Sequence, residues 1–166
     1  MNTLEVLKKR RSIREYADKP IPKKVLEEII DCARYAPTAR NVQPWEFVVV
    51  TGKPALERLA GLCEYGKFIA QAGACILVLC EDTKYYLEDG VAATENVLLA
   101  AAHFGVGSCW VAGDKKPYGK DVLKLVGAPA KMKLVSVLSL GYPKSKAEFK
   151  LMKKRALKGM LRWEKY

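Results

Sequence analysis

Residues 84–104, with the sequence KYYLEDGVAATENVLLAAAHF, carry the longest helical pattern of the chain. Apolar side chains recur at helical spacing on two of its sides, as Val91, Leu98 and Ala102 and as Ala93, Val97 and Ala100. The remaining polar stripe is narrow and consists of Glu88, Asp89, Glu95, Asn96 and His103. A helix that is apolar nearly all round is buried. In a chain of 166 residues this predicts a central helix that packs against a second subunit.

Shorter patterns on both sides predict the other elements of a single domain over residues 1–166. A capping box of Asn2 and Glu5 predicts a first helix that stops near Arg10. Further helices are expected over residues 22–36, 54–62 and 118–126. Apolar runs predict strands over residues 47–50, 75–80, 108–112 and 134–140. Helices and strands alternate irregularly, which is typical of an α+β sheet covered by helices.

Composition narrows the class of protein. The chain has 29 Lys and Arg against 18 Asp and Glu, a net charge of +11, which indicates either an anionic partner or a lysine-rich solvated surface. The five cysteines form no CxxC pair, so we expect reduced core thiols and a cytoplasmic protein. A single histidine and the lack of metal-ligand spacing predict no metal site. The N-terminus lacks a signal-peptide pattern and no apolar run reaches ~18 residues, so we expect no membrane association.

Three polar clusters point to a phosphorylated ligand. The first is Arg10-Arg11-Ser12-Ile13-Arg14, the second is residues 37–45 (PTARNVQPW), and the third is Lys153-Lys154-Arg155. Guanidinium groups bind phosphate in a bidentate way, and a serine hydroxyl adds a further donor. Alone, the first cluster could be a basic helix end and the second a polar turn. Together they could converge on one anion.

Other kinds of site are disfavoured. Gly105 and Gly107 form a GxG, but it follows a helix and precedes a strand, the reverse of the Rossmann order. No nucleophile and base pair is visible, since His103 lies on the polar stripe of the long helix. Hydrolysis by a Ser/His or Cys/His arrangement is therefore not expected.

In their order along the chain, these clusters resemble the nitroreductase family of FMN-dependent oxidoreductases. The resemblance rests on residues 10–16, 36–45, 89–101, 105–110, 140–143 and 153–155. It implies an α+β fold with a central mixed β-sheet flanked by helices. It also implies an intertwined homodimer, in which an arm of about residues 142–166 embraces the partner and FMN binds at the interface.

The resemblance also assigns residues to the phosphate end of FMN. Arg10, Ser12, Lys153 and Arg155 would bind the phosphate and the ribityl chain. Arg11 lies within the same motif and would contribute through its backbone.

A second group is assigned to the flavin ring. Arg14 would lie toward the pyrimidine edge, where a positive charge favours the anionic reduced flavin. Lys67 is a stand-in for a family lysine at the same end, and Ala112 and Gly113 match the segment whose backbone N–H reaches flavin N5. The residues implied to come from the other subunit are Pro37, Thr38, Ala39 and Asn41.

The implied reaction is ping-pong hydride transfer from NADH or NADPH, through flavin N5, to a small electron acceptor such as a nitro compound, a quinone or a flavin. It needs no catalytic acid or base from the protein. Two alternatives stay open. One is a protein that binds or converts flavin without this turnover. The less favoured one is a basic nucleic-acid-binding protein. It would use basic residues of the C-terminal part with two nearby aromatic residues, namely Lys150, Lys153, Lys154, Arg155, Lys158, Trp163 and Tyr166. We expect no nucleic-acid partner, because no known nucleic-acid-binding module is present.

Overall fold

The computed structural model describes residues 2–145 and 151–166. Within these residues the helices are α1 (Thr3–Lys9), α2 (Lys23–Ala33), α3 (Lys53–Leu62), α4 (Tyr86–His103) and α5 (Gly119–Leu125). The strands are β1 (Trp45–Val50), β2 (Ala74–Glu81), β3 (Gly107–Ala112) and β4 (Met132–Gly141). Short 3-10 helices are η1 (Ala39–Asn41), η2 (Lys67–Gln71) and η4 (Leu157–Gly159). The α+β class expected from the sequence is confirmed.

The four strands form one sheet in the order β1-β2-β4-β3, and every neighbouring pair is antiparallel. The prediction of a mixed sheet is therefore wrong for these strands. The connection between β1 and β2 shows why: α3 runs across one face of the sheet, and η2 packs against α3 and β4 before β2 begins. The chain therefore re-enters the sheet at the end where β1 finished. As a result, Val50 at the end of β1 pairs with Cys75 at the start of β2. The parallel contact found in the described residues is an isolated bridge between Ser12 and Ser108.

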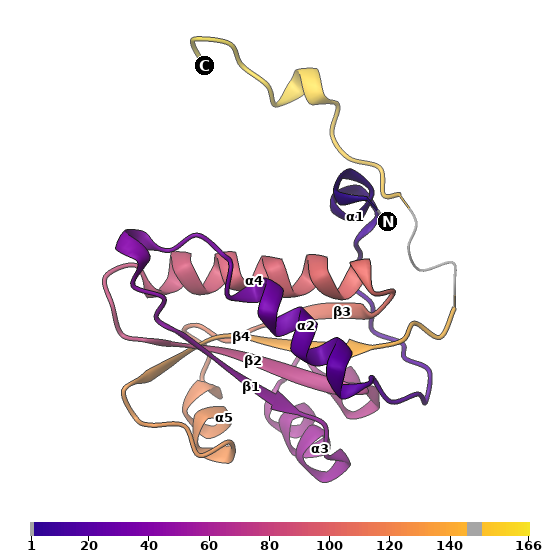
Figure 1. Ribbon diagram of the computed structural model, residues 1–166, viewed down its shortest axis with the longest axis vertical. Coiled ribbons are helices and arrows are strands. Elements are labelled where there is room, and N and C mark those ends of the chain that lie inside the picture. The colour runs from indigo at the N-terminus through magenta and orange to yellow at the C-terminus, as the bar shows by residue number, and fades with distance from the viewer. Residues whose placement is uncertain (1, 146–150) are drawn as a thin grey trace.

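Helices cover both faces of this sheet (Figure 1). On one face, α2 and α4 pack against the sheet, and on the other face α3 and α5 do so. The central strand β2 is buried from Ala74 to Cys80, as its continuous apolar run predicts. Because α4 lies against the sheet and against α2, two of its sides are covered within one chain. This accounts for part of its all-round apolar character.

Helix termini follow local sequence rules. The backbone N–H of Glu5 donates to Asn2 Oδ1 at 3.0 Å and that of Asn2 donates to Glu5 Oε2 at 3.2 Å, which confirms the predicted capping box. Helix α2 ends at Ala33, three residues earlier than expected. The next residues form tight turns, since the N–H of Ala36 donates to the carbonyl of Ala33. A residue before proline avoids helical backbone angles, so Pro37 already acts on Ala36.

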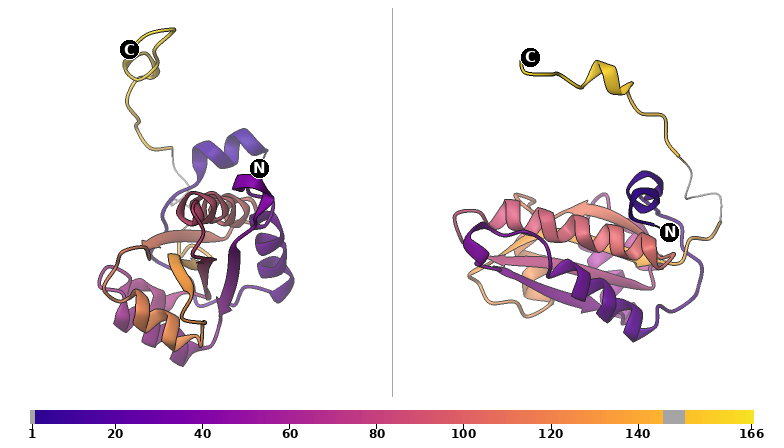
Figure 2. Two further views of the ribbon diagram at one scale, coloured as in Figure 1. Left: turned by 90° about the vertical axis from the view of Figure 1, so that its left-hand side faces the viewer. Right: turned by 45° about the horizontal axis from the view of Figure 1, so that its top comes forward.

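The C-terminal segment 151–166 extends away from the rest of the chain and is exposed along its whole length (Figures 1 and 2). The predicted arm began at residue 142, but Pro143 still bridges Tyr16 beside the sheet. Residues 146–150 of that arm, with Lys150, lie outside the described residues. Among the residues described, no helix is both long and apolar enough to cross a lipid bilayer.

Candidate functional site

The arginine cluster runs along the outer edge of β3. The N–H of Ile13 donates to the carbonyl of Ser108 at 2.9 Å, and Ser12 forms the parallel bridge to the same residue. The Ile13 side chain is buried against Gly107, where an added Cβ would lie 2.8 Å from Ile13 Cβ. The missing side chain at Gly107 therefore allows the cluster to lie close to the sheet.

Tyr16 fixes the other end of this segment. Its hydroxyl donates to the carbonyl of Ile13 at 2.6 Å and shares a 2.6 Å hydrogen bond with Ser139 Oγ on β4. Its ring lies on Gly141, where a Cβ would come within 2.6 Å of a ring carbon. Burial raises the pKa of Tyr16, so the hydroxyl stays a hydrogen-bond donor. The segment from Ile13 to Tyr16 is thus tied to two strands.

Arg10, Ser12 and Arg14, which the sequence predicts to bind FMN, lie in the segment that runs beside β3. Burial raises the pKa of the Cys109 thiol on β3, and the neighbouring groups that oppose the rise are Arg14, Ser12 and Arg10. Arg14 also lies over the ring of Phe68, 5.8 Å from its centroid. Arg10 Nε lies 3.8 Å from Glu95 Oε1 on α4, a part-exposed pair of modest strength. Two permanent cations and a hydroxyl therefore lie together at one edge of the sheet.

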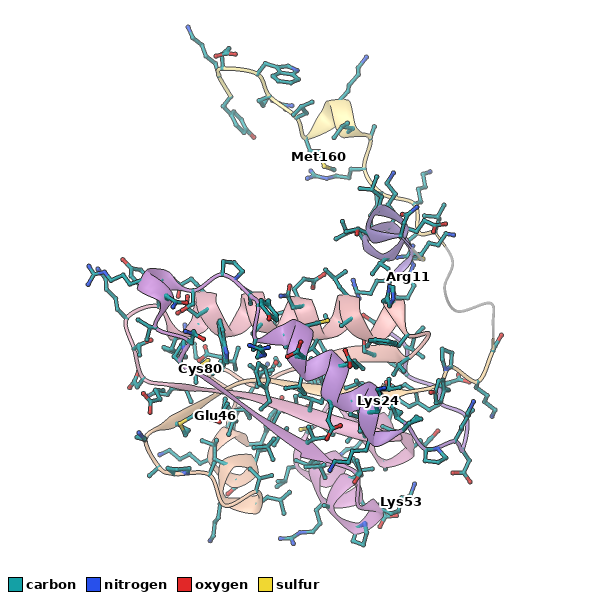
Figure 3. The ribbon with its side chains drawn as sticks, in the orientation of Figure 1. Arg11, Lys24, Glu46, Lys53, Cys80 and Met160 are labelled. Atoms are coloured by element: carbon teal, nitrogen blue, oxygen red, sulfur yellow. The ribbon has the colours of Figure 1, made fainter. Side chains whose placement is uncertain are left out.

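The Arg11 guanidinium makes local contacts at the end of α1. It donates to the carbonyls of Arg10 and Lys8, the last turn of α1, while its buried Nε has no partner. Figure 3 shows Arg11 at the end of α1. Two of the five N–H donors of the guanidinium are therefore used on the end of α1.

The start of the C-terminal segment approaches the same cluster. A hollow of about 390 Å³ is lined by residues 11–15 together with Met152. Lys153 and Arg155 follow directly and are exposed. Met152, which directly precedes the third sequence cluster, therefore lies beside residues 11–15.

The loop with Pro37, Thr38, Ala39 and Asn41 lies elsewhere on the chain. It is bound to Asp89 in the first turn of α4, whereas Arg10 pairs with Glu95 six residues later. Six residues of helix span about 9 Å, so the two clusters occupy different positions along α4. Within one chain the loop and the arginine cluster are therefore anchored at different turns of α4.

The segment at Ala112 and Gly113 is held at the end of β3. The N–H of Gly113 donates to the carbonyl of Val135 at 3.2 Å, and a Cβ at this glycine would lie 2.7 Å from Leu134 Cγ. The Tyr118 hydroxyl donates to the carbonyl of Ala112. The segment is rigid, and the N–H of Gly113 is already paired in the single chain.

Lys67 points to a helix end. Its ammonium donates to the carbonyls of Ala60 and Gly61, both at 3.1 Å, near the C-terminus of α3. A cation there complements the helix dipole. The next residue, Phe68, contacts Arg14 through its ring, so η2 borders the arginine cluster. The Lys67 ammonium instead contacts the end of α3.

Three residues around the site were missed from the sequence: Tyr16, Asp89 and Cys109. Tyr16 lay within the quoted motif but gave no sign of its two hydrogen bonds. Asp89 resembled the solvated acids of the polar stripe, yet it is only 5% exposed. Cys109 resembled an ordinary core thiol. The described part of the chain holds no group of three His, Cys, Asp or Glu side chains placed to bind a metal ion.

Comparison with known proteins fits this geometry. The model of the Nitroreductase family matches residues 7–83 and 63–142. A relative from Archaeoglobus fulgidus, named NADH dehydrogenase/NAD(P)H nitroreductase, is 38% identical over 154 residues, which is 88% of each chain. The chain belongs to the nitroreductase family.

Solved structures of family members show the same fold. A structure from Bacteroides thetaiotaomicron, also named NADH dehydrogenase/NAD(P)H nitroreductase, has a TM-score of 0.92 and 29% identity, covering 99% of this chain and 98% of the other. A nitroreductase from Desulfovibrio desulfuricans, described in complex with FMN, has a TM-score of 0.86 and 25% identity, covering 100% of this chain and 98% of the other. The short single-domain form expected from the sequence is thus shared with solved relatives.

Proposed function

We propose that this chain is an FMN-dependent oxidoreductase that uses NADH or NADPH to reduce a small electron acceptor. The observation that carries the proposal is the placement of Arg10, Ser12 and Arg14 in one segment along the outer edge of β3, in a member of a family with a solved FMN complex. FMN, when bound, supplies the chemistry by accepting a hydride and passing electrons to a second molecule. The acceptor class we propose is a nitro compound, a quinone or a flavin.

The chain's own residues would bind and orient the cofactor. Arg10 and Ser12 would hold the phosphate with Lys153 and Arg155, because charge-assisted hydrogen bonds contribute ~1.5–3 kcal/mol each. The Arg14 guanidinium would place a positive charge beside the ring. The ring of Phe68 lies against the Arg14 guanidinium, 5.8 Å from its centroid to Cζ. The rigid segment at Gly113 would border the ring at the opposite end of β3.

A homodimer would complete the site. The loop over residues 37–41 is anchored at Asp89 and the arginine cluster at Glu95, and a second copy would bring the loop of one chain to the arginine cluster of the other. The C-terminal segment supports this arrangement, since it exposes Leu157, Met160, Leu161 and Trp163, an apolar surface of the kind that marks an interface.

The other surface of this interface is proposed to be the open side of β1. A groove of about 830 Å³ lies there between α2 and β1 and is lined by the half-buried Phe47 and the exposed Val49. It offers apolar side chains and an unpaired strand edge to the C-terminal segment of a second copy. Figure 3 shows Met160 far from the sheet of its own chain, where such a segment could reach a partner.

The test is spectroscopic. We expect the purified protein to be yellow and to bleach when NADH or NADPH is added without oxygen. A yellow protein indifferent to both nucleotides would instead be a flavin-binding protein without this turnover. A colourless protein that shifts a labelled oligonucleotide would contradict the flavin proposal and favour nucleic-acid binding.

A further inference from the structure

Asp89 is a buried carboxylate that holds one loop. It lies in the first turn of α4 and is 5% exposed. Its Oδ2 accepts the hydroxyl proton of Thr38 at 2.8 Å, and its Oδ1 accepts the N–H of Ala39 at 3.1 Å. A buried charge is tolerated only when such donors surround it. Both carboxylate oxygens of Asp89 therefore accept hydrogen bonds from the same short loop, about 50 residues earlier in the chain.

The loop that Asp89 holds has an unfavourable backbone. Arg40, Asn41 and Gln43 have φ values of 56°, 57° and 52°, in the left-handed region that residues other than glycine rarely adopt. Such a conformation persists only where the surroundings impose it. Thr38 transmits the constraint, since its Oγ1 donates to Asp89 and accepts the N–H of Gln43 at 3.1 Å. Asp89 thereby ties down both ends of the left-handed turn.

We propose that Asp89 is a positioning residue of the flavin site, acting through the loop over residues 38–43. This inference rests on the proposed function, in which Thr38, Ala39 and Asn41 contact the flavin of the other subunit. Asp89 itself would not touch the cofactor. By imposing the left-handed turn before the flavin arrives, it would remove the need to order the loop on binding, which improves affinity.

The test compares two variants that remove the same charge from adjacent residues. Asp89→Asn keeps the size of the side chain but replaces one acceptor oxygen by an NH₂ group, which faces a donor of Thr38 or Ala39. Glu88→Gln is the matched control, because Glu88 is exposed. Amide hydrogen exchange of residues 38–43 is measured in the full-length protein. We expect the amides of Ala39 and Gln43 to exchange at least about tenfold faster in Asp89→Asn, a change of ~1.4 kcal/mol in opening, and to stay unchanged in Glu88→Gln.

Binding of FMN and riboflavin then separates positioning from general loss of structure. Asp89→Asn should raise the Kd of both flavins by a similar factor, at least about tenfold, because the loop is assigned to the ring. Arg10→Ala should raise the Kd of FMN alone, because riboflavin lacks the phosphate. A melting temperature of Asp89→Asn close to that of wild type shows that the fold is kept. A Thr38→Val variant, which removes the same hydrogen bond from the loop side, should reproduce the faster amide exchange.

Three outcomes would overturn the inference. One is amide exchange in Asp89→Asn within about twofold of wild type. Another is faster exchange with unchanged affinity for both flavins, which would show that the loop does not shape the site. The third is an equal effect of Glu88→Gln. A wild-type protein that binds neither flavin contradicts the proposed function and the flavin part of this inference, whereas the exchange comparison still decides whether Asp89 holds the loop.

Discussion

Replacing Tyr16 by Phe removes one oxygen atom from the anchor of the arginine cluster. That oxygen makes two hydrogen bonds of 2.6 Å, to the carbonyl of Ile13 and to Ser139 Oγ, and both are buried. A hydrogen bond contributes a net ~0.5–1.5 kcal/mol, so the variant should lose about 1–3 kcal/mol of unfolding free energy. For a domain of this size each kcal/mol lowers the melting temperature by about 2–4 °C.

Urea unfolding followed by circular dichroism gives the measurement. Tyr65→Phe is the matched control, since Tyr65 is 77% exposed and a surface substitution changes stability by no more than about 0.5 kcal/mol. One of the lost hydrogen bonds holds the carbonyl of Ile13, which lies between Ser12 and Arg14. The Tyr16→Phe variant should therefore also release FMN more readily than the control. An unfolding free energy equal to that of Tyr65→Phe would refute the claim that this hydroxyl anchors the cluster.

Two further predictions concern charge. Arg10→Ala should weaken FMN binding about 10–100-fold, the factor for one lost charge-assisted hydrogen bond, whereas Lys8→Ala should leave it unchanged; equal retention of FMN in both variants would count against the phosphate site. Burial raises the pKa of Cys63 to about 11 and that of Cys80 to about 12. The folded state keeps these protons while the unfolded state releases them near pH 9, so unfolding free energy should be retained below about pH 9 and fall as pH rises toward about 12. Urea titrations across this range should show a shallower fall for Cys63→Ala, and an unaltered slope would argue against the buried thiol as a cause.

The parts of the fold that follow from neighbouring residues could be predicted from the sequence. The capping box of Asn2 and Glu5 concerns one turn, and the apolar pattern of residues 84–104 marks α4 to within two residues at its N-terminal end. The direction of the strands could not be read in the same way. It depends on the path of α3 and η2 between β1 and β2, which periodicity does not reveal, and so the mixed sheet was wrong.

For the candidate site, too, the side-chain chemistry could be read from the sequence, whereas the contacts that each side chain makes could not. Arginines at residues 10 and 14 were recognised because their side-chain chemistry suits a phosphate. Arg11 and Lys67 have the same chemistry, but each donates to carbonyls at the end of a helix: Arg11 to the turn just before it, and Lys67 to α3, six and seven residues earlier. Asp89 was missed for the converse reason. An acid on a polar stripe is usually solvated, and only the packed loop shows that this one is buried.

The claim that two chains build each flavin site is tested most directly by complementation. Arg10→Ala alters one half of the proposed site, and Asn41→Gly alters the other half while tolerating the left-handed backbone at that position. Each variant alone should retain little FMN after gel filtration. Co-expressed with different affinity tags and purified as a mixed dimer, the two should form one intact site and retain half of the FMN held by the wild-type dimer. A mixed dimer that retains no more FMN than either variant alone would contradict a site shared between two chains.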